Sequence, residues 1–273
     1  MRDGTVPKKL FKYLSYREEF FEELLLRVTP FGEFNDPFEG LLTKDSYTHF
    51  LKNGLVGTDK EREEATKIVN DGWEKIAADI KMDDWGIICF AENCDCLLMW
   101  AHYANSHKGI LIELDTIGSG NAIHPFFEKE IDAKYPPNQL KTDIKPVFYP
   151  TDSKRVCIAS VPKANLTMKL LCHSKIHSAL FKSKEWAYEK EHRMFLNYAK
   201  LANIITKEKM HFIRIPEEVI SKIYIGCRAE NKDEIINNFT EAKKAKPKLE
   251  HVKLFESVLD ETDFKVNYEE IKV

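Results

Sequence analysis

The densest group of side chains that could do chemistry lies near residue 190. Glu189, Glu191 and Arg193 are spaced two residues apart and are followed by the apolar residues 194–196. Alternate residues of a strand point to one face, so this spacing predicts that two carboxylates and a guanidinium lie together. Two close carboxylates repel each other, which raises the pKa of one of them unless a cation compensates. The alternative is a solvated charged face.

A second group joins an apolar segment to a set of aromatic side chains. Residues 86–90 predict a buried strand that ends at Phe90, and residues 97–104 predict a helix that carries Trp100, His102 and Tyr103. A flat heterocycle binds by stacking on aromatic faces of this kind. The alternative is packing against a sheet, which is the commoner place for Trp and Tyr side chains.

A third group is the segment from Phe34 to Glu39, which contains Asn35, Asp36 and Pro37. Asn and Asp close turns with their own side chains, and a proline fixes the backbone that follows them. We expect either a purely structural turn or a rigid loop that presents Asn35, Asp36 or Glu39 to a ligand.

Metal ligands are sparse along the chain. Cys94 and Cys96 are closer in sequence than zinc ligands usually are, and His173 and His177 lack the glutamate of a zinc-protease motif. The sequence contains no phosphate-binding loop, nucleophile elbow or dinucleotide-binding glycine motif. It therefore predicts no metal site and none of those classes of enzyme.

The composition limits the classes of function. The chain has 273 residues and a formal net charge of −3, from 41 Lys and Arg against 44 Asp and Glu. Bulk binding of nucleic acid is not expected of this balance, because each neutralised phosphate needs a cation. No apolar run approaches the ~20 residues that cross a membrane. The six scattered cysteines are typical of free thiols, so we expect a cytoplasmic protein with no membrane partner.

The elements that must position these side chains mix strands and helices without strict alternation. We therefore predict an α+β fold: a single domain over residues 1–273, with a mixed or antiparallel sheet, flanking helices and a loop-rich insertion near residues 115–150. The longest helix, over 59–80, places Ile68, Trp73, Ile76 and Ile80 on its apolar side. The predicted strands are residues 10–13, 27–29, 86–90, 109–114, 191–196, 211–215, 223–226 and 251–255, and the predicted helices are residues 18–26, 59–80, 97–104, 166–181 and 231–244.

In combination, these segments resemble domain-of-unknown-function family 2971, which is found mainly in bacteria. The resemblance covers roughly residues 10–260. Membership of that family does not by itself imply an activity. The residues that carry the resemblance are 11–13, Thr29-Pro30, 34–39, 99–104, Gly109-Ile110, Trp186, Tyr188, Glu189, Glu191 and Arg193.

A more distant resemblance is to ADP-ribosyltransferases of the poly-ADP-ribose-polymerase-like superfamily. Residues 86–92, the helix after them and residues 108–112 are similar to its central motif, and residues 10–13 look like its first motif. Glu191 matches the catalytic glutamate of its third motif. Lys12 stands where the superfamily has a histidine, or Tyr13 takes the role of that histidine, and Trp100 stands where the superfamily has a tyrosine. The resemblance implies an ADP-ribosyltransferase-like core that uses NAD as a substrate.

The same resemblance implies a role for each candidate residue. Glu191 is the catalytic carboxylate, and Glu189 orients or deprotonates an acceptor. That acceptor is a protein, a nucleic acid, a small molecule or water, and the sequence does not distinguish them. The residues expected to bind NAD are Lys12, Tyr13, Asn35, Asp36, Phe90, Trp100, His102, Tyr103 and Arg193.

Two other functions fit the same chain. One is a binding module for NAD, ADP-ribose or a protein, without the chemistry, which the changes at Lys12 and Trp100 favour. The other is a metal-dependent nuclease, in which a cluster of carboxylates with a lysine binds Mg²⁺. The candidate residues for that cluster are Glu113, Asp115, Glu189 and Glu191 with Lys182 or Lys184.

Overall fold

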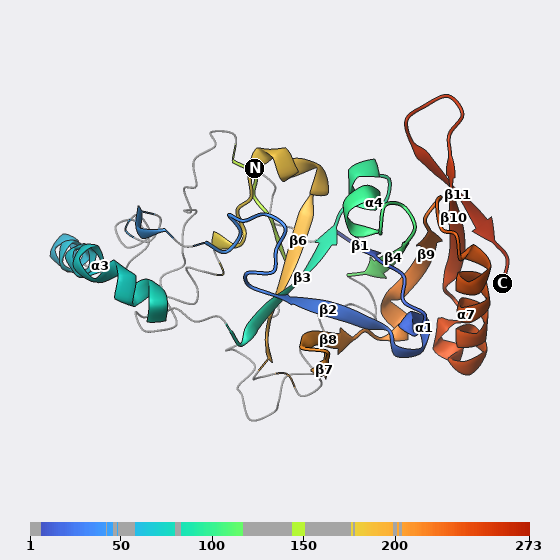
Figure 1. Ribbon diagram of the computed structural model, residues 1–273, viewed down its shortest axis with the longest axis horizontal. Helices are drawn as coiled ribbons and strands as arrows, with labels where there is room; N and C mark the ends of the chain where they lie inside the picture. Colours follow the sequence, from blue (N-terminus) through green and yellow to red (C-terminus); the bar gives the residue numbers. More distant parts are fainter. Residues whose placement is uncertain are drawn as a thin grey trace. The chain divides into compact units, whose positions relative to one another are not determined.

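The protein is an α+β structure with a mostly antiparallel open sheet and a few helices, which confirms the predicted fold class (Figure 1). The computed structural model describes residues 7–41, 43–45, 48, 58–79, 83–116, 144–150, 176, 178–198, 201 and 204–273.

The strands are β1 (Lys9–Leu14), β2 (Leu25–Pro30), β3 (Trp85–Ala91), β4 (Ile110–Asp115), β5 (Ile144–Pro146), β6 (Glu191–Asn197), β7 (Ile205–Lys207), β8 (Met210–Arg214), β9 (Ile220–Ile225), β10 (Lys253–Leu259) and β11 (Val266–Ile271). The helices are α1 (Phe20–Glu23), α3 (Asp59–Asp79), α4 (Leu97–Tyr103) and α7 (Lys232–Ala245), and the 3-10 helices are η2 (Lys184–Glu189), η4 (Glu217–Val219) and η5 (Pro247–Leu249).

Hydrogen bonds join the described strands in the order β11-β10-β9-β4-β1-β3-β2-β8-β7. In addition, β6 pairs with β3 and β5 pairs with β6. β9 and β10 are parallel, whereas β1 is antiparallel to both β3 and β4. Two segments that the sequence singles out, β1 and β6, are therefore both neighbours of β3.

The chain divides into two compact units. The first consists of Met1–Val28, Ile88–Pro146 and Tyr188–Val273, and the second of Thr29–Ile87 and Val147–Ala187. Both β2 and β3 contribute residues to each unit. The single domain over residues 1–273 remains a prediction.

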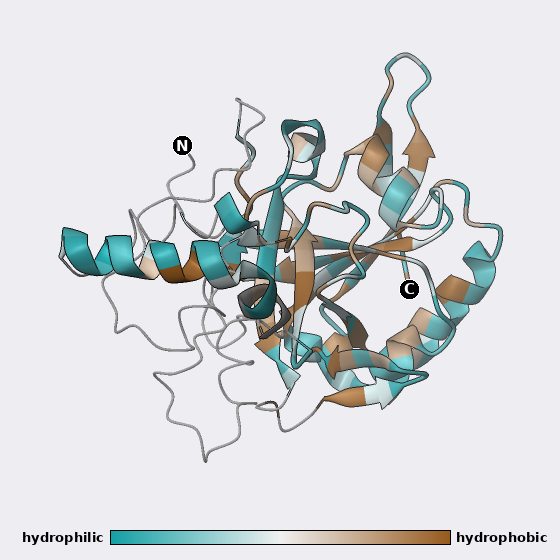
Figure 2. Ribbon diagram, turned by 60° about the vertical axis from the view of Figure 1, so that its left-hand side comes forward, coloured by the Kyte–Doolittle hydropathy of each residue, from teal (hydrophilic) through white to brown (hydrophobic). Residues whose placement is uncertain are grey.

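Burial in the first unit follows the two-residue period of its strands. Leu10 of β1 lies in a large core with α1 and α7, in which the rings of Phe21 and Phe239 are 5.3 Å apart. Phe11 and Tyr13 belong to a second cluster that contains α4. The sheet therefore has α7 over one face and α4 over the other. Figure 2 shows α3 mostly in teal with a short brown stretch, while brown and teal alternate along the strands and α7.

The helix predicted over residues 18–26 is wrong in its second half. α1 ends where the chain turns at Leu24, whose φ is +51°. Leu25 and Leu26 then begin β2, and both are buried. A short apolar run fits a buried strand as well as a helix, so periodicity alone does not separate the two.

α3 spans almost the predicted range, but its buried side differs from the prediction. Ile68 is 67% exposed, whereas Val69 and Thr66 are buried. Trp73 is half-buried, and it follows a kink at Gly72, where φ is −121°. The side chain of Ile76 and the whole of Ile80 lie outside the described residues.

The C-terminal part contains two strands that the sequence did not predict. β11 pairs antiparallel with β10, with Ser257 opposite Tyr268, so the strand predicted at 251–255 is not the last. β7 pairs with β8 in a hairpin. The short strand β5 was not predicted either. Most of the helix predicted over 166–181 and most of the insertion near 115–150 lie outside the described residues.

The turn between β7 and β8 has a backbone conformation that a substitution can test. Glu208 and Lys209 have φ values of +48° and +67°, a conformation that Asn and Gly adopt at lower cost. We expect the exchange of Glu208-Lys209 for Asn-Gly to raise the free energy of unfolding by about 1 kcal/mol. Urea unfolding measures the change, with Lys207→Gly as a control that should destabilise the strand. A lower urea midpoint for the Asn-Gly variant than for the wild type would contradict the positive φ values of this turn.

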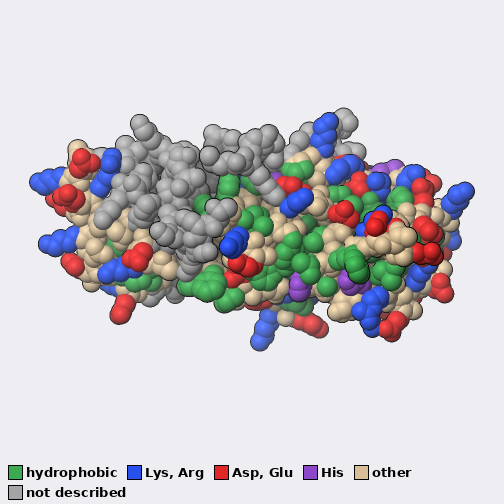
Figure 3. Space-filling view, turned by 90° about the horizontal axis from the view of Figure 1, so that it is seen from above, with side chains coloured by type: hydrophobic (Ala, Val, Ile, Leu, Met, Phe, Trp, Pro, Cys, Tyr) green, Lys and Arg blue, Asp and Glu red, His purple; other side chains and the backbone are tan. Residues whose placement is uncertain are grey.

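Charged side chains of both signs share the surface. On the face drawn in Figure 3, Lys and Arg side chains lie among Asp and Glu side chains. None of the helices in the described part of the chain is long and apolar enough to cross a membrane.

Candidate functional site

Glu191 and Arg193 form a buried ion pair at the start of β6. The guanidinium of Arg193 donates from Nε to Oε1 of Glu191 at 2.8 Å and from Nη2 to Oε2 at 2.7 Å. Arg193 is completely buried, and Glu191 is nearly so. The two-residue spacing places both side chains on one face of the strand, as predicted, and the two-point contact fixes the plane of the carboxylate.

Glu189 is not on this strand, which corrects the expectation that it shares a face with Glu191. It ends η2, and the chain turns at Lys190, whose φ is +43°. The buried carboxylate of Glu189 accepts a hydrogen bond from the Oη of Tyr103 at 2.6 Å. Glu189 is therefore linked to α4, whereas Glu191 belongs to the sheet.

Two further strands bring titratable groups towards Glu191. The Nζ of Lys12 in β1 donates to the backbone oxygen of Cys89 in β3 at 2.8 Å. Burial lowers the pKa of Lys12, while nearby Cys89 and Glu191 oppose that shift. Burial raises the pKa of the Cys89 thiol, and the charge of Glu191 adds to the shift. Lys12, Cys89 and Glu191 therefore lie on β1, β3 and β6, and β3 pairs with both of the other strands.

Trp100 lies inside the second core cluster. Its side chain is 1% exposed, and its Nε1 donates to the backbone oxygen of Cys94 at 3.0 Å. The ring meets Tyr13 edge to face at 5.3 Å and lies nearly parallel to His107 at 6.5 Å. Tyr13 in turn donates from its Oη to the backbone oxygen of Asn93 at 2.9 Å. A ligand can stack on Trp100 only after these neighbours move.

The accessible aromatic group at this end of α4 is His102. It is exposed, and its ring centroid lies 6.4 Å from that of Tyr188 and 6.3 Å from that of Tyr103. Tyr188 precedes Glu189, and Tyr103 bonds to Glu189. Aromatic rings and a buried carboxylate are therefore neighbours here, which suits a flat ligand with hydrogen-bond donors.

A pair that the sequence reasoning missed lies between β3 and β6. The Nε2 of His192 is 2.7 Å from Oε1 of Glu92, and His192 is almost completely buried. His192 alternates with Glu191 and Arg193 along β6, so it points to the opposite face. Glu92 ends the segment 86–92 and His192 stands between Glu191 and Arg193, but only the pairing of β3 with β6 brings these two residues, 100 positions apart, together.

The comparison with known families concerns the segment that holds most of these side chains. Residues 99–194 match the profile of a family described as a protein of unknown function (DUF2971). This match supports the DUF2971 assignment. Neither a curated protein nor a solved structure matches the chain.

The matched segment includes the last five residues of α4, all of η2 and the first four residues of β6. It therefore contains Tyr103, Glu189, Glu191 and Arg193, whereas Lys12 lies outside it. Phe90, which also precedes the segment, packs in the large core with α7. Its role as a ligand-binding residue stays a prediction.

Asn35 and Asp36 belong to the second unit. Asp36 is buried, and its Oδ1 accepts a hydrogen bond from the backbone nitrogen of Phe38 at 2.9 Å, which closes the predicted turn. Asn35 is exposed. In the same unit, Lys182 pairs with Glu39 at 2.7 Å and lies over the ring of Trp186 at 4.6 Å. These contacts favour the structural interpretation of this turn.

Glu113, a candidate for the nuclease cluster, is the centre of a different network. Its carboxylate accepts hydrogen bonds from Tyr224 at 2.8 Å, Ser221 at 2.9 Å and Lys222 at 3.2 Å, and it pairs with Lys9 at 3.2 Å. Among the residues that the structure describes, no three His, Cys, Asp or Glu side chains are placed to hold one metal ion. The nuclease alternative thus rests on the sequence alone.

The Glu113 network predicts a pH dependence of stability. Burial raises the pKa of Glu113, but hydrogen bonds from Tyr224, Ser221 and the lysines lower it more, so the folded pKa lies below its ordinary value. The stabilisation is therefore present above the ordinary range near pH 4 and is lost as the pH falls through the folded pKa. We expect Glu113→Gln to cost about 1–3 kcal/mol at pH 7 and less near pH 3. Urea unfolding at both pH values tests this, and an equal cost at both contradicts it.

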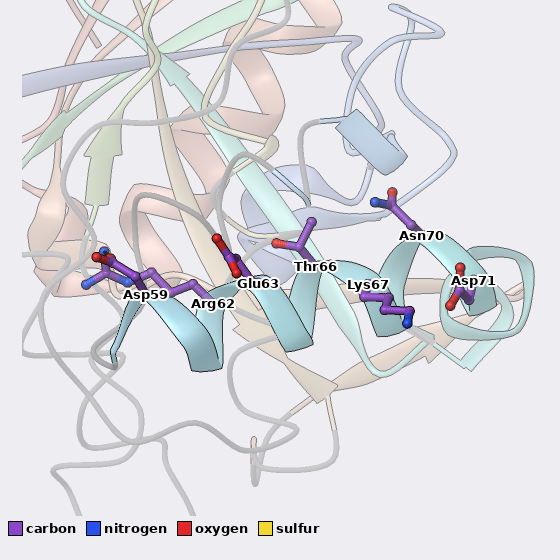
Figure 4. Close-up of a pocket in the computed structure, with 7 residues that line it drawn as sticks. All are labelled: Asp59, Arg62, Glu63, Thr66, Lys67, Asn70 and Asp71. Atoms are coloured by element: carbon purple, nitrogen blue, oxygen red, sulfur yellow. Dashed lines mark hydrogen bonds and ion pairs between the residues drawn. The ribbon is translucent and has the colours of Figure 1, made fainter.

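The second unit contains a hollow of about 560 Å³ along α3 (Figure 4). Ligand sites usually draw side chains from several elements. All residues known to line this hollow come from one helix, and none is a predicted site residue, so we assign it no function. They are Asp59, Arg62, Glu63, Thr66, Lys67, Asn70 and Asp71.

Proposed function

We propose that this protein is an NAD-dependent ADP-ribosyltransferase-like enzyme, which cleaves the nicotinamide–ribose bond and transfers ADP-ribose to an acceptor. The observation that carries the proposal is that β3 pairs with both β1 and β6, the strand that carries Glu191. β1 and β6 hold the segments that are similar to the first and third motifs of the superfamily, and β3 begins the segment that is similar to its central motif. Their order in the sequence does not require them to be neighbours in the sheet.

The proposed chemistry needs a fixed negative charge. Departure of nicotinamide leaves positive charge on the ribose, as in glycoside hydrolysis. A carboxylate held in place near that carbon stabilises the transition state more than the ground state. Glu191 is suited to this role, because the two hydrogen bonds from Arg193 fix its orientation before substrate binds.

Of the remaining side chains, one would act on the acceptor and the others would bind NAD. Glu189, held by Tyr103, would orient or deprotonate the acceptor. Lys12 and Tyr13 would hold the ribose or the phosphates. The nicotinamide would stack on an aromatic side chain of α4, and of these His102 is the most exposed, whereas Tyr103 is half-buried and Trp100 is buried.

Ligand-induced thermal stabilisation tests the proposal first. The purified chain is melted with NAD, ADP-ribose or Mg²⁺, each alone. A ligand at 100 times its dissociation constant stabilises the folded state by roughly 2.7 kcal/mol, which a melting curve detects. We expect a shift with NAD. A shift with Mg²⁺ alone would favour the nuclease alternative, and no shift with any of them would contradict the proposal.

A second candidate function is a binding module that has lost the chemistry. Two observations favour it: Trp100 is buried, and the carboxylate of Glu191 is already engaged by Arg193. NAD or ADP-ribose that binds without any release of nicotinamide would identify this case.

A further inference from the structure

The hairpin of β10 and β11 ends in a loop that stands out from the rest of the sheet (Figure 1). Two large apolar side chains are exposed at this tip: Phe264 is fully exposed, and Leu259 is 69% exposed. Single exposed apolar residues are common on soluble proteins. A phenylalanine held in solvent at the end of a projecting hairpin is less common, because its burial against a partner would be strongly favourable.

The backbone that carries Phe264 is ordered by its own hydrogen bonds. The carboxylate of Asp260 accepts bonds from the backbone nitrogens of Thr262 and Asp263 at 2.9 and 2.8 Å, and from Nδ2 of Asn267 at 2.8 Å. The hydrogen bond from Asn267 and those from the backbone hold the pKa of Asp260 well below its ordinary value, so the carboxylate stays charged at neutral pH. A fixed loop loses little conformational entropy when it binds.

The base of the hairpin is anchored as firmly as its tip. Tyr268 of β11 donates from its Oη to the backbone oxygen of Cys94 and accepts from Nε1 of Trp100 at 3.4 Å. Its ring packs against Tyr224 with centroids 4.7 Å apart. The hairpin is therefore a rigid extension of the sheet.

The charge of the tip restricts what can bind to it. The loop contains three acidic residues, Asp260, Glu261 and Asp263, and one basic residue. That residue, Lys265, pairs with Asp263 at 2.9 Å and with Asp260 at 3.4 Å, which leaves a net negative charge. An anionic lipid surface or a nucleic acid would be repelled by this excess of negative charge. A second copy of the same tip would be repelled for the same reason.

We propose that this hairpin is a docking element for a protein partner, whose surface has an apolar pocket that takes Phe264 and a rim of Lys or Arg that faces the acidic loop. The inference goes beyond the NAD chemistry and does not depend on it. Buried aromatic anchors surrounded by complementary charge are the usual source of binding energy in such interfaces.

The test uses an array of purified, folded proteins of known isoelectric point, probed with the labelled full chain. The variants are Phe264→Ser and Glu261→Lys, and the control is Ile68→Ser, which removes an exposed apolar side chain from α3, away from the hairpin. Circular dichroism first confirms that all variants fold. The strongest binder is then titrated by interferometry at low and physiological salt.

We expect the bound proteins to be mainly basic. Phe264→Ser should weaken binding tenfold or more, Glu261→Lys should weaken it several-fold with an effect that shrinks in salt, and Ile68→Ser should leave it unchanged. The proposal is overturned if nothing binds below 100 µM or if Phe264→Ser binds like the wild type. It is also overturned if sedimentation shows a dimer that Phe264→Ser abolishes, since a second copy would then be the partner.

Discussion

Replacement of Arg193 by methionine is expected to lower the free energy of unfolding by about 3–5 kcal/mol. Arg193 is completely buried, and both of its hydrogen bonds to Glu191 are shorter than 3 Å. Methionine fills a similar volume but leaves the carboxylate of Glu191 buried without the guanidinium. Urea unfolding of the wild type and the variant measures the loss.

Two further variants separate this effect from a general effect of losing a cation. Lys253 pairs with Glu270 at 3.1 Å, but both side chains are exposed, so Lys253→Met should cost less than about 1 kcal/mol. The double variant Arg193→Met with Glu191→Leu leaves neither charge buried and should recover much of the stability. A cost for Arg193→Met no larger than that for Lys253→Met would mean that the ion pair is not buried in solution.

Glu191→Gln is expected to lower the rate of nicotinamide release from NAD by about 10²–10³-fold. Glutamine keeps the size of the side chain and can still accept a hydrogen bond from Arg193, but it removes the negative charge that the transition state requires. Because the ground state of NAD gains little from that charge, the dissociation constant of NAD should change only a few-fold. Chromatography measures the release, and calorimetry measures the binding.

Glu270→Gln is the matched control for this prediction, because it makes the same exchange at an exposed position on β11. Its rate should equal that of the wild type. If Glu191→Gln is folded, binds NAD and releases nicotinamide at the wild-type rate, Glu191 has no catalytic role. If both variants lose activity together, the loss does not come from the site.

Much of the sheet follows from alternation of side chains in the sequence. β1, β3, β4 and β6 lie close to their predicted ranges, because their apolar residues repeat with the period of a strand or form short buried runs. The pairing of Glu191 with Arg193 also follows from a spacing of two residues. Local periodicity was sufficient for these features because each depends on one element only.

The rest of the site depends on conformations that residue types do not reveal. Leu24 and Lys190 both adopt positive φ values, although neither is a glycine or an asparagine. The first ends α1 early, and the second separates Glu189 from the strand of Glu191. Surrounding packing outweighs the local preference at both positions.

Contacts between residues that are far apart in the sequence could not be predicted either. The packing of Tyr13 on the ring of Trp100 and the hydrogen bond from Trp100 to Tyr268 place Trp100 in the core cluster with α4. The contact of Lys12 with Cys89 joins residues 77 positions apart. Such contacts follow from which strands are neighbours, and a single sequence does not contain that order.

The measurement that tests the central claim most directly is the release of nicotinamide from NAD by the purified wild-type chain, followed over time with Glu191→Gln in parallel. The proposal predicts that the wild type releases nicotinamide in proportion to enzyme concentration and that the variant binds NAD but releases almost none. A folded wild-type chain that binds NAD without releasing nicotinamide would contradict an enzymatic role and leave a binding module. A chain that neither binds nor cleaves NAD would contradict the whole assignment of the site.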